Sequence, residues 1–540
     1  MSRTSRLLVF LFIAAFVACQ NSTKKVVSND SHLGEISFKV SGNEAAQSSF
    51  IEGMLLLHSF EYEDSRTAFL KAQKSDPEMA MAYWGEAMTH NHALWQQQDK
   101  DAAIEALEKL APNREARMAL VPTQVEKDFF EGAEILFGDG TKYERDLAYR
   151  DHMEQLSKKY KDNNEASAFY AISLLGASRN GRDAELYGKS AQIAKGIIKE
   201  NPNHPGALHY LIHSYDDPEH AHLAKEAADN YAKVAPDAAH ALHMPSHIYV
   251  ALGLWDEVVS SNIGSWNASV KRMKRKELDG NAKSYHAYRW LHYGLLQKGE
   301  YQKANEMLNQ MVGYVDEAPN NNARGYLIGM KGAQLVESNM WDSPEADIEI
   351  DLENHGHQAK SGFLFIDGLK AYHQEDAIQL ASVIENHQAL SAEAANNLDP
   401  MGFPMCSSGG RPTTKLGVSI MKIKELELQG YLEALNGNRV KAIEHFEQGC
   451  KMDENISYSY GPPTIFKPIH EAYAEWLFEQ GDYQKALEYF DKSLDRNPRR
   501  LLSLKGKKAS AVALDQQEVI VSVDKEIQNC LMDQEREVVL

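Results

Sequence analysis

Two segments of the chain place histidines at matching intervals. His209 and His213 are four residues apart, and so are His243 and His247. Side chains four residues apart lie on one face of a helix. The intervals from 209 to 243 and from 213 to 247 are both 34 residues, so the two pairs occupy equivalent positions in a repeat of that length. The spacing predicts that four imidazoles from two adjacent helices converge on one point.

Converging imidazoles are suited to metal binding. Neutral imidazole is a ligand for zinc, copper, iron and nickel, and zinc sites take three or four ligands. His240 precedes the second pair on the same side and is expected to be a fifth ligand or to orient the others. The pattern predicts one transition metal, zinc or copper, on these five histidines. Two interpretations without metal stay open: a groove that binds a peptide or small anion, and histidines that only pack between repeats.

Further polar residues fall at the corresponding positions of other repeats. His286, Arg289 and Tyr293 do so in the unit that follows, and Glu471 and Glu475 do so in the last unit. We expect them to line the same groove and bind the ligand. Arg289 would hold an anionic group. The glutamates would act as a base if the repeats wind into a superhelix that brings them across the groove.

The same residues allow functions of different classes. A hydrolase or oxidase would use an open coordination position on the metal. A scaffold would dock a partner protein without metal. The sequence contains no HExxH pair, Gly-rich phosphate loop or GxSxG elbow, so it assigns no catalytic residue.

Helix pairs must position these side chains. The clearest unit, KPIHEAYAEWLFEQGDYQKALEYFDKSLDRNP, starts at Lys467 and closes at Pro498. Gly481 is placed to end its first helix. The unit resembles the tetratricopeptide consensus, and looser copies recur along the chain at about 34 residues. The resemblance implies an all-α protein, an α-solenoid of helix pairs wound into a superhelix with a concave groove. The matching positions are Tyr473, Ala474, Leu477, Tyr483, Ala486, Phe490 and Ser493.

The clarity of the repeat divides the mature chain. The expected parts are tetratricopeptide-like helices over 37–160, a histidine-rich core over 161–315, an irregular helical region with a Pro/Gly loop over 316–420, clear repeats over 421–515 and a tail over 516–540.

The first residues have the features of a leader. A basic start precedes an apolar run from Leu7 to Ala18, which suits a signal peptide. Phe16-Val17-Ala18-Cys19 resembles a bacterial lipobox, which implies lipidation at Cys19 and residues 20–36 as a flexible tether. We expect the protein to be anchored in a bacterial cell envelope, at the outer membrane or the periplasmic face. An ordinary secretory signal with a chance cysteine is the alternative.

Composition narrows the partners. The chain has 540 residues and a formal net charge of -20, which argues against a nucleic-acid surface. Peptides, proteins and small anions remain as groove ligands. Cys406, Cys450 and Cys530 allow one disulfide that the sequence does not choose.

Four blocks extend the resemblance: FYAISLLGAS, HPGALHYLIHSYDDPEHA, HALHMPSHIYVALGLWDE and GPPTIFKPIHEAYAEWL. Together they look like a group of envelope-associated bacterial tetratricopeptide proteins. The resemblance implies the fold and marks motif positions, but it implies no reaction. The marked positions are His204, His209, His213, His240, His243, Pro245 and His247, followed by Pro462, Pro463, Lys467, Pro468, His470 and Glu471.

Overall fold

The computed structural model describes residues 32–179, 181–317, 321–398 and 413–531. Within these ranges nearly all regular structure is helical, and the strands β1 (Asn91–His92) and β2 (Gln97–Gln98) form one short antiparallel pair. The all-α prediction is therefore confirmed. None of the described helices is long and apolar enough to cross a membrane. The predicted leader with Cys19 and the Pro/Gly loop around Cys406 lie outside the described residues.

The helices pack in consecutive pairs, with glycines facing an aromatic ring. Phe69 lies between Gly53 of the preceding helix and Gly85 of the next. A Cβ atom on Gly53 would lie 2.8 Å from the Phe69 ring, and one on Gly85 would lie 2.3 Å from it. Gly430 faces Phe446 in the same way, with 2.9 Å to the ring. Small residues are needed here because the helices approach closely around each ring, as in a solenoid of helix pairs.

The described part of the N-terminal half consists of nine α-helices, with the β1–β2 pair and the short helix η1 between α3 and α4. The described part of this half begins with residues 32–36, which were expected to belong to the flexible tether. This expectation is corrected from residue 33 onward, because Leu33 and Ile36 are buried in the core and the Glu35 amide donates to the Asn203 carbonyl. The elements are α1 (Glu44–His58), α2 (Tyr62–Ser75), α3 (Ala80–Met88), η1 (Ala93–Trp95), α4 (Lys100–Glu108), α5 (Arg114–Leu120), α6 (Gln124–Leu136), α7 (Lys142–Lys159), α8 (Asn164–Gly176) and α9 (Ala184–Glu200).

The middle of the chain contains an interrupted helix. Pro245 lacks the amide hydrogen that a helix interior needs, and it stands at the first position of a new helix. His243 therefore ends one helix and His247 lies in the next, so the two side chains belong to different helices. The elements are α10 (Pro205–Ser214), η2 (Ala221–Leu223), α11 (Lys225–Val234), α12 (Ala239–His243), α13 (Pro245–Ala251), α14 (Trp255–Arg275), η3 (Gly280–Ala282) and α15 (Tyr285–Gln297).

The C-terminal half continues the stack to residue 531. Residues 517–531 of the expected tail form α25, whose Val523 and Cys530 are buried in the core. Cys450 and Cys530 are free thiols. The elements are α16 (Tyr301–Glu317), α17 (Asn321–Ser338), η4 (Pro344–Asp347), α18 (His357–His373), α19 (Ala377–Asn396), α20 (Lys415–Leu435), α21 (Arg439–Glu454), α22 (Ile469–Glu479), α23 (Tyr483–Arg496), α24 (Leu501–Ala513) and α25 (Gln517–Leu531).

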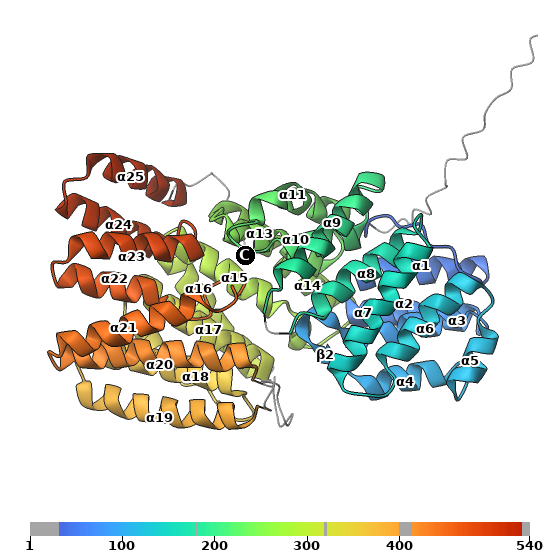
Figure 1. Cartoon of the computed structure of the whole chain (residues 1–540), viewed down its shortest axis with the longest axis horizontal. Helices are drawn as coiled ribbons and strands as arrows, with labels where there is room; N and C mark the ends of the chain where they lie inside the picture. Colours follow the sequence, from blue (N-terminus) through green and yellow to red (C-terminus); the bar gives the residue numbers. More distant parts are fainter. Residues whose placement is uncertain (1–31, 180, 318–320, 399–412, 532–540) are drawn as a thin grey trace, which may run out of the picture.

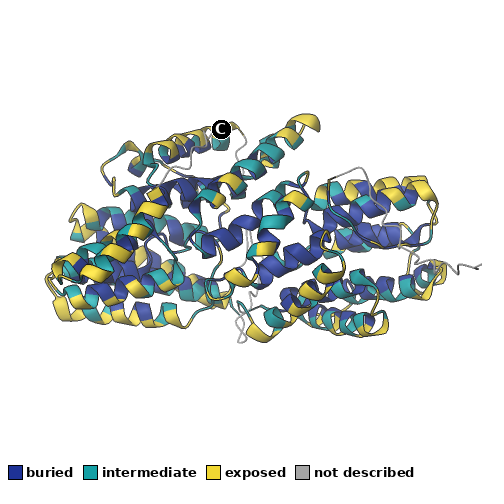
Figure 2. Cartoon of the chain, turned by 90° about the horizontal axis from the view of Figure 1, so that it is seen from above, coloured by how far each residue is buried: buried dark blue, intermediate teal, exposed yellow. Residues whose placement is uncertain are grey.

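The two halves lie side by side, with the middle helices between them. In Figure 1 the blue to teal helices α1–α7 lie at the right, the gold to red helices α19–α25 at the left, and α10, α13 and α15 near the centre. Seen from above in Figure 2, the central helices are mostly dark blue, whereas the outer helices carry most of the yellow, exposed residues. The segment that holds the predicted metal ligands therefore lies between the two halves.

Candidate metal centre

The five histidines predicted as ligands come together, and a sixth joins them. Each ring lies 4.5–5.2 Å, centroid to centroid, from at least one other ring of the group. They are contributed by α10, α12, α13 and α15, so the break at Pro245 and the 34-residue repeat both serve to bring them together. We call this group the histidine cluster: His209, His213, His240, His243, His247 and His286.

Most of the histidine cluster is shielded from solvent. His209, His213, His243 and His247 are between 0% and 6% exposed, whereas His240 and His286 are half-buried. The sequence placed these side chains on the wall of an open groove. In the structure they are instead enclosed, so a ligand that reaches them must be small or must enter from the side of the half-buried pair.

Hydrogen bonds to Nδ1 fix the tautomer of two rings. The Nδ1 of His209 lies 2.7 Å from the backbone carbonyl of His58, which only accepts hydrogen bonds. The Nδ1 of His243 lies 2.6 Å from Oδ1 of Asn262, and the Asn262 amide nitrogen donates to the Val258 carbonyl at 2.7 Å. Both histidines must therefore carry their hydrogen on Nδ1. Their Nε2 atoms are left as bare lone pairs, the form that binds metal.

A single carboxylate does the same for two more rings. Oδ2 of Asp216 lies 3.2 Å from Nδ1 of His213 and 3.1 Å from Nδ1 of His247. Asp216 is 1% exposed, and it also forms an ion pair with Arg182. The guanidinium and the two imidazoles, acting against burial, lower the pKa of Asp216, so it is an anion that accepts hydrogen bonds. A carboxylate behind a histidine is the common arrangement around metal ligands.

The other ring nitrogens of the cluster lack partners. The Nε2 atoms of His209, His240, His243 and His247 are buried and have no hydrogen-bond partner among the described residues. A buried polar atom without a partner is costly. Isolated cases occur elsewhere in the described chain, on His292, His355 and His387. Only in the histidine cluster do four such nitrogens gather, each from a ring close to the next.

A second buried group of similar composition serves as a contrast. Glu165 lies 2.7 Å from Nε2 of His58 and 3.1 Å from Nε2 of His204, and all three are fully buried. Nδ1 of His58 meets the Tyr210 hydroxyl at 2.8 Å, and Nδ1 of His204 accepts the Ala207 amide at 3.2 Å. Every nitrogen here already has a partner. We therefore interpret this triad as a hydrogen-bonded support for α1, α8 and α10 and not as a metal site.

Burial keeps four histidines of the cluster neutral. Desolvation, followed by the neighbouring imidazoles, lowers the pKa of His209 and His240 well below 6.5. The same causes act on His243, and desolvation also lowers the pKa of His247 despite Asp216. A neutral imidazole is required for metal binding, so these residues are ready ligands at neutral pH.

Aromatic side chains form one wall of the cluster. The Trp290 ring lies 4.6 Å from His247 and 4.8 Å from His243. Gly461 lies against Trp290, and a Cβ atom on Gly461 would be 2.2 Å from Cζ2 of that indole. Next to it in the chain, the Tyr460 ring is 4.9 Å from His247. The segment before α22, which the sequence marked by its Pro462 and Pro463, thus joins the C-terminal half to the cluster.

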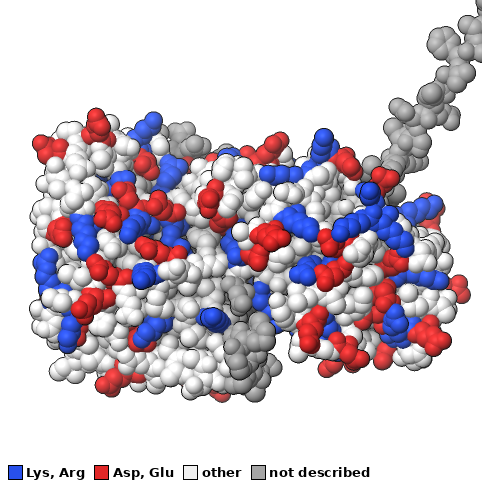
Figure 3. All heavy atoms as spheres, in the orientation of Figure 1, with Lys and Arg blue, Asp and Glu red and all other residues white. Residues whose placement is uncertain are grey.

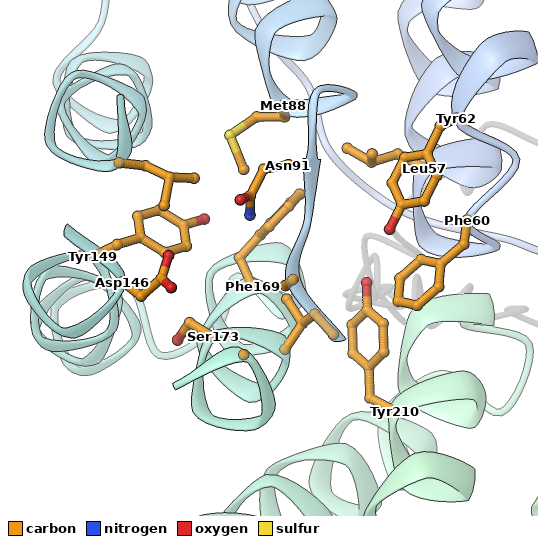
Figure 4. Close-up of a pocket in the computed structure, with 14 residues that line it drawn as sticks. Leu57, Phe60, Tyr62, Met88, Asn91, Asp146, Tyr149, Phe169, Ser173 and Tyr210 are labelled. Carbon is orange, nitrogen blue, oxygen red and sulfur yellow. The ribbon is translucent and has the colours of Figure 1, made fainter. Parts of the chain in front are cut away.

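An apolar cavity adjoins the other side (Figure 4). Phe60 separates it from the cluster, since the Phe60 ring lines the cavity and lies 4.2 Å from His209. Tyr62 and Tyr210 also line this end, and Asp146 and Tyr149 lie across from them. The cavity therefore offers mainly apolar contact with a few hydroxyl groups close to the histidines.

The remaining predicted residues divide between two places. His286 belongs to the cluster, and Arg289 is half-buried one turn further along α15. Tyr293 lies elsewhere, with its hydroxyl 3.1 Å from Nη1 of Arg500. Glu471 is fully buried and accepts from Arg500 at 2.7 and 3.0 Å. Its neighbour Glu475 pairs with Lys467 at 2.5 Å.

These contacts place Tyr293, Glu471 and Glu475 around a buried ion-pair network and not among the histidines. Arg500 and Lys467, acting against burial, lower the pKa of Glu471 to about 2, while burial raises the pKa of Glu475. The role of these three residues in ligand binding stays a prediction.

Several residues of the site were not predicted from the sequence. Asp216 follows His213 by three residues within the block already marked by its histidines, so its position was the available signal. Asn262, Trp290, Tyr460 and Phe60 come from other helices or loops. No local pattern connects them to the cluster, because only the packing of the solenoid brings them there.

The comparisons with known proteins agree with the fold class. Residues 468–500 match the tetratricopeptide repeat family. This confirms the repeat that was predicted from residue 467 and shows a tetratricopeptide repeat in the C-terminal half. No curated protein matches the chain.

Several solved structures are similar over most of the chain. Yeast Tom70 has 13% identity and a TM-score of 0.33, with 89% of this chain and 99% of that chain covered. Ypp1 has 10% identity and a TM-score of 0.37, covering 90% and 89%. The human IFIT1 dimer with m7Gppp-AAAA has 15% identity and a TM-score of 0.36, covering 92% and 91%. Because TM-scores this low do not establish a shared fold in detail, these similarities carry no functional argument.

Proposed function

We propose that this chain is a metal-binding tetratricopeptide-type protein, in which a transition metal on the histidine cluster binds a ligand. The observation that carries the proposal is the set of four buried, unpartnered Nε2 atoms on His209, His240, His243 and His247. A metal ion satisfies all of the lone pairs that it coordinates at once, which no hydrogen bond among the described residues does. Zinc and copper are the metals that best suit a donor set of imidazoles.

The groups that hold the rings by their Nδ1 atoms support the same proposal. Asp216, Asn262 and the His58 carbonyl each hold a ring by Nδ1, which leaves Nε2 directed away from the support. This matches the way that proteins orient metal-ligating histidines. A packing role alone does not require that four neighbouring rings share the same tautomer.

The bound ligand is proposed to be a peptide or a small molecule with an anionic group. Arg289 is near the cluster on α15, and the described residues offer it no ion-pair or hydrogen-bond partner. Lys424 is 2% exposed, and burial lowers its pKa to about 8. The positive charge of Arg289 also lowers the pKa of Lys424, so the two side chains are close. A half-buried arginine and a buried lysine without a full complement of carboxylates favour an anion as the missing partner.

A scaffold without metal is the second candidate. The tetratricopeptide repeat at 468–500 favours it, since stacks of such repeats present extended surfaces for partner proteins. On the face shown in Figure 3, acidic and basic side chains are interspersed and do not form a patch of one sign. A surface of this kind suits contacts with a protein better than steering by a uniform charge. A hydrolase or oxidase at the metal is the enzymatic alternative.

The expected place of action is also a proposal. The lipobox-like Cys19 and the apolar run before it favour a lipid-anchored protein of the bacterial envelope, at the outer membrane or the periplasmic face. Labelling of growing cells with a radioactive fatty acid would test it. Label on the native chain that is lost in Cys19→Ser supports the anchor, and equal label on both opposes it.

Metal content tests the proposed function. The full chain is purified in mild detergent without affinity tag or chelator, and its metals are measured by plasma mass spectrometry. The test variant has His209, His213, His243 and His247 changed to Ala. We expect bound zinc or copper in the native chain and none in the variant at equal helicity. His387→Ala is the control, because His387 is a buried histidine on α19, outside the cluster. Absence of metal from the native chain, even after zinc or copper is added, would favour the scaffold.

A further inference from the structure

We infer that the histidine cluster is a two-metal centre. One ion would be held by His209, His213 and His240, and the other by His243, His247 and His286. This inference rests on the proposed metal function and specifies it further. The first observation is geometric: within each set of three, one nitrogen per ring lies within 4.8 Å of the corresponding nitrogens of the other two. No histidine belongs to both sets.

The use of the ring nitrogens is the second observation. A ring whose Nδ1 is hydrogen-bonded can offer only Nε2 to a metal. A single tetrahedral ion takes at most four such donors. It could use the four unpartnered Nε2 atoms only if they met at one point, but these histidines fall into different groups, His209 with His240 and His243 with His247. Two ions, with three imidazoles each, use all six rings.

Asp216 links the two sets. Its Oδ2 atom is near Nδ1 of His213 in the first set and of His247 in the second. Another possible ligand group, of His213, Asp216 and His247, meets the same distance condition. It would have to use the nitrogens that are already hydrogen-bonded to Asp216. We therefore assign Asp216 to support one ligand of each ion and not to bind metal directly.

The spacing of the sets fits a pair of ions. The rings of His213 and His247 are 5.2 Å apart, and those of His240 and His243 are 6.0 Å apart. Two-metal sites hold their ions about 3.5–4 Å from each other. Rings at these separations, turned edge to face for His213 and His247 at 83°, can direct their Nε2 atoms to two neighbouring points.

Three protein ligands per ion leave room for an exogenous ligand. Sites of this type keep a coordination position for water or substrate, in contrast to closed structural sites with four protein ligands. Imidazole donors are uncharged, so two divalent ions on six of them carry a positive charge. Asp216, already paired with Arg182, offsets part of it, and Glu61 accepts the His240 backbone amide at 2.9 Å. The centre therefore suits first-row divalent ions, zinc or copper, together with an anionic oxygen ligand.

Metal stoichiometry tests the inference with zinc ion as the probe. The full chain is stripped of metal, incubated with excess zinc, desalted and analysed for zinc per chain. Two variants remove two ligands of one set each: His209→Gln with His240→Gln, and His243→Gln with His286→Gln. We expect two zinc ions in the native chain and one in each variant. His387→Gln is the control and should keep two.

The outcomes separate this inference from the proposed function. One zinc ion in the native chain and none in either variant would overturn the two-metal centre but keep the metal function. No zinc in any protein would overturn both. Circular dichroism of each variant, together with cobalt in place of zinc, shows whether the remaining set is intact, because cobalt bound by three imidazoles gives visible absorption. Cobalt absorption of about half the native intensity in both variants is the expected result, and equal intensity in the native chain and the variants contradicts it.

Discussion

His213 and His247, which lie 34 residues apart in the sequence, share one carboxylate oxygen. Their Nδ1 atoms lie 3.2 and 3.1 Å from Oδ2 of Asp216. The two rings thus have the same tautomer and a fixed separation, although they belong to different helices. This relationship turns a repeat in the sequence into a built arrangement of nitrogen donors.

Removal of the shared charge should weaken metal binding. Asp216→Asn removes the negative charge behind the rings. If its amide oxygen still accepts from both rings, its amide nitrogen, a donor, faces the donating guanidinium of Arg182. Loss of such a supporting carboxylate lowers metal affinity by about 10–100-fold. Zinc affinity measured by competition with a chromophoric chelator gives the value. Asp217→Asn is the matched control, because Asp217 pairs with Arg182 and His220 and not with the cluster. Equal losses in both variants would contradict the role of Asp216.

The contact between Gly461 and Trp290 should be intolerant of a methyl group. Gly461 has a φ of +89°, and an added Cβ atom would lie 2.2 Å from the indole. Gly461→Ala should therefore displace Trp290 from His247 and lower the free energy of unfolding by about 1–3 kcal/mol, as overpacking does. Thermal unfolding measures the loss. Gly481→Ala is the control, since Gly481 has a φ of +79° but no atom within 4 Å of the added Cβ. If both variants lose the same stability, only the backbone is strained and the indole contact is unimportant.

The buried ion pair should contribute far more to stability than an exposed one. Arg500 is 1% exposed and pairs with Glu471 at 2.7 Å and with Glu337 at 2.5 Å. Arg500→Met leaves these carboxylates buried without their cation, which costs about 3–5 kcal/mol. Urea unfolding followed by circular dichroism measures the change. Arg114→Met is the control, because Arg114 has a 60% exposed side chain and its pair with Glu131 should contribute about 0–1 kcal/mol. Comparable losses in the two variants would contradict the large contribution of the buried ion pairs.

The metal-free protein should lose stability as the pH falls through about 6.5. Burial lowers the pKa of His209, His240 and His243 well below that of an unfolded chain, and lowers the pKa of His292 to about 3. Below pH 6.5 the unfolded chain takes up protons on these residues and the folded chain does not. Each such histidine lowers the free energy of unfolding by about 1.4 kcal/mol per pH unit. Burial also raises the pKa of several carboxyl groups, Glu427 and Glu475 among them, and these groups act in the opposite direction.

Melting temperatures of the chelator-treated protein between about pH 7.5 and about pH 5.5 check this expectation. A clear fall in the melting temperature on acidification is expected, and His292→Gln should make the fall shallower. A fall of equal size in His292→Gln and in the native chain would contradict the neutral, buried state of His292.

The sequence predicted the parts of the fold that follow from periodicity. The 34-residue repeat and the alternation of glycine and aromatic residues are local, so the helix pairs and the convergence of His213 with His247 could be predicted from the sequence. The enclosure of the cluster could not, because Trp290 and Tyr460 reach it from segments far apart in the chain. Likewise, the pairing of Glu471 with Arg500 depends on how the last repeats stack, and no pattern near either residue indicates it.

X-ray absorption at the metal edge shows directly whether imidazole nitrogens bind the metal. The native chain, purified without tag or chelator, is measured at the zinc and copper edges. We expect a first shell of nitrogen or oxygen at about 2.0–2.1 Å together with the outer-shell scattering that imidazole rings produce. A shell of sulfur at about 2.3 Å, a shell of oxygen without imidazole scattering, or no bound metal would contradict it.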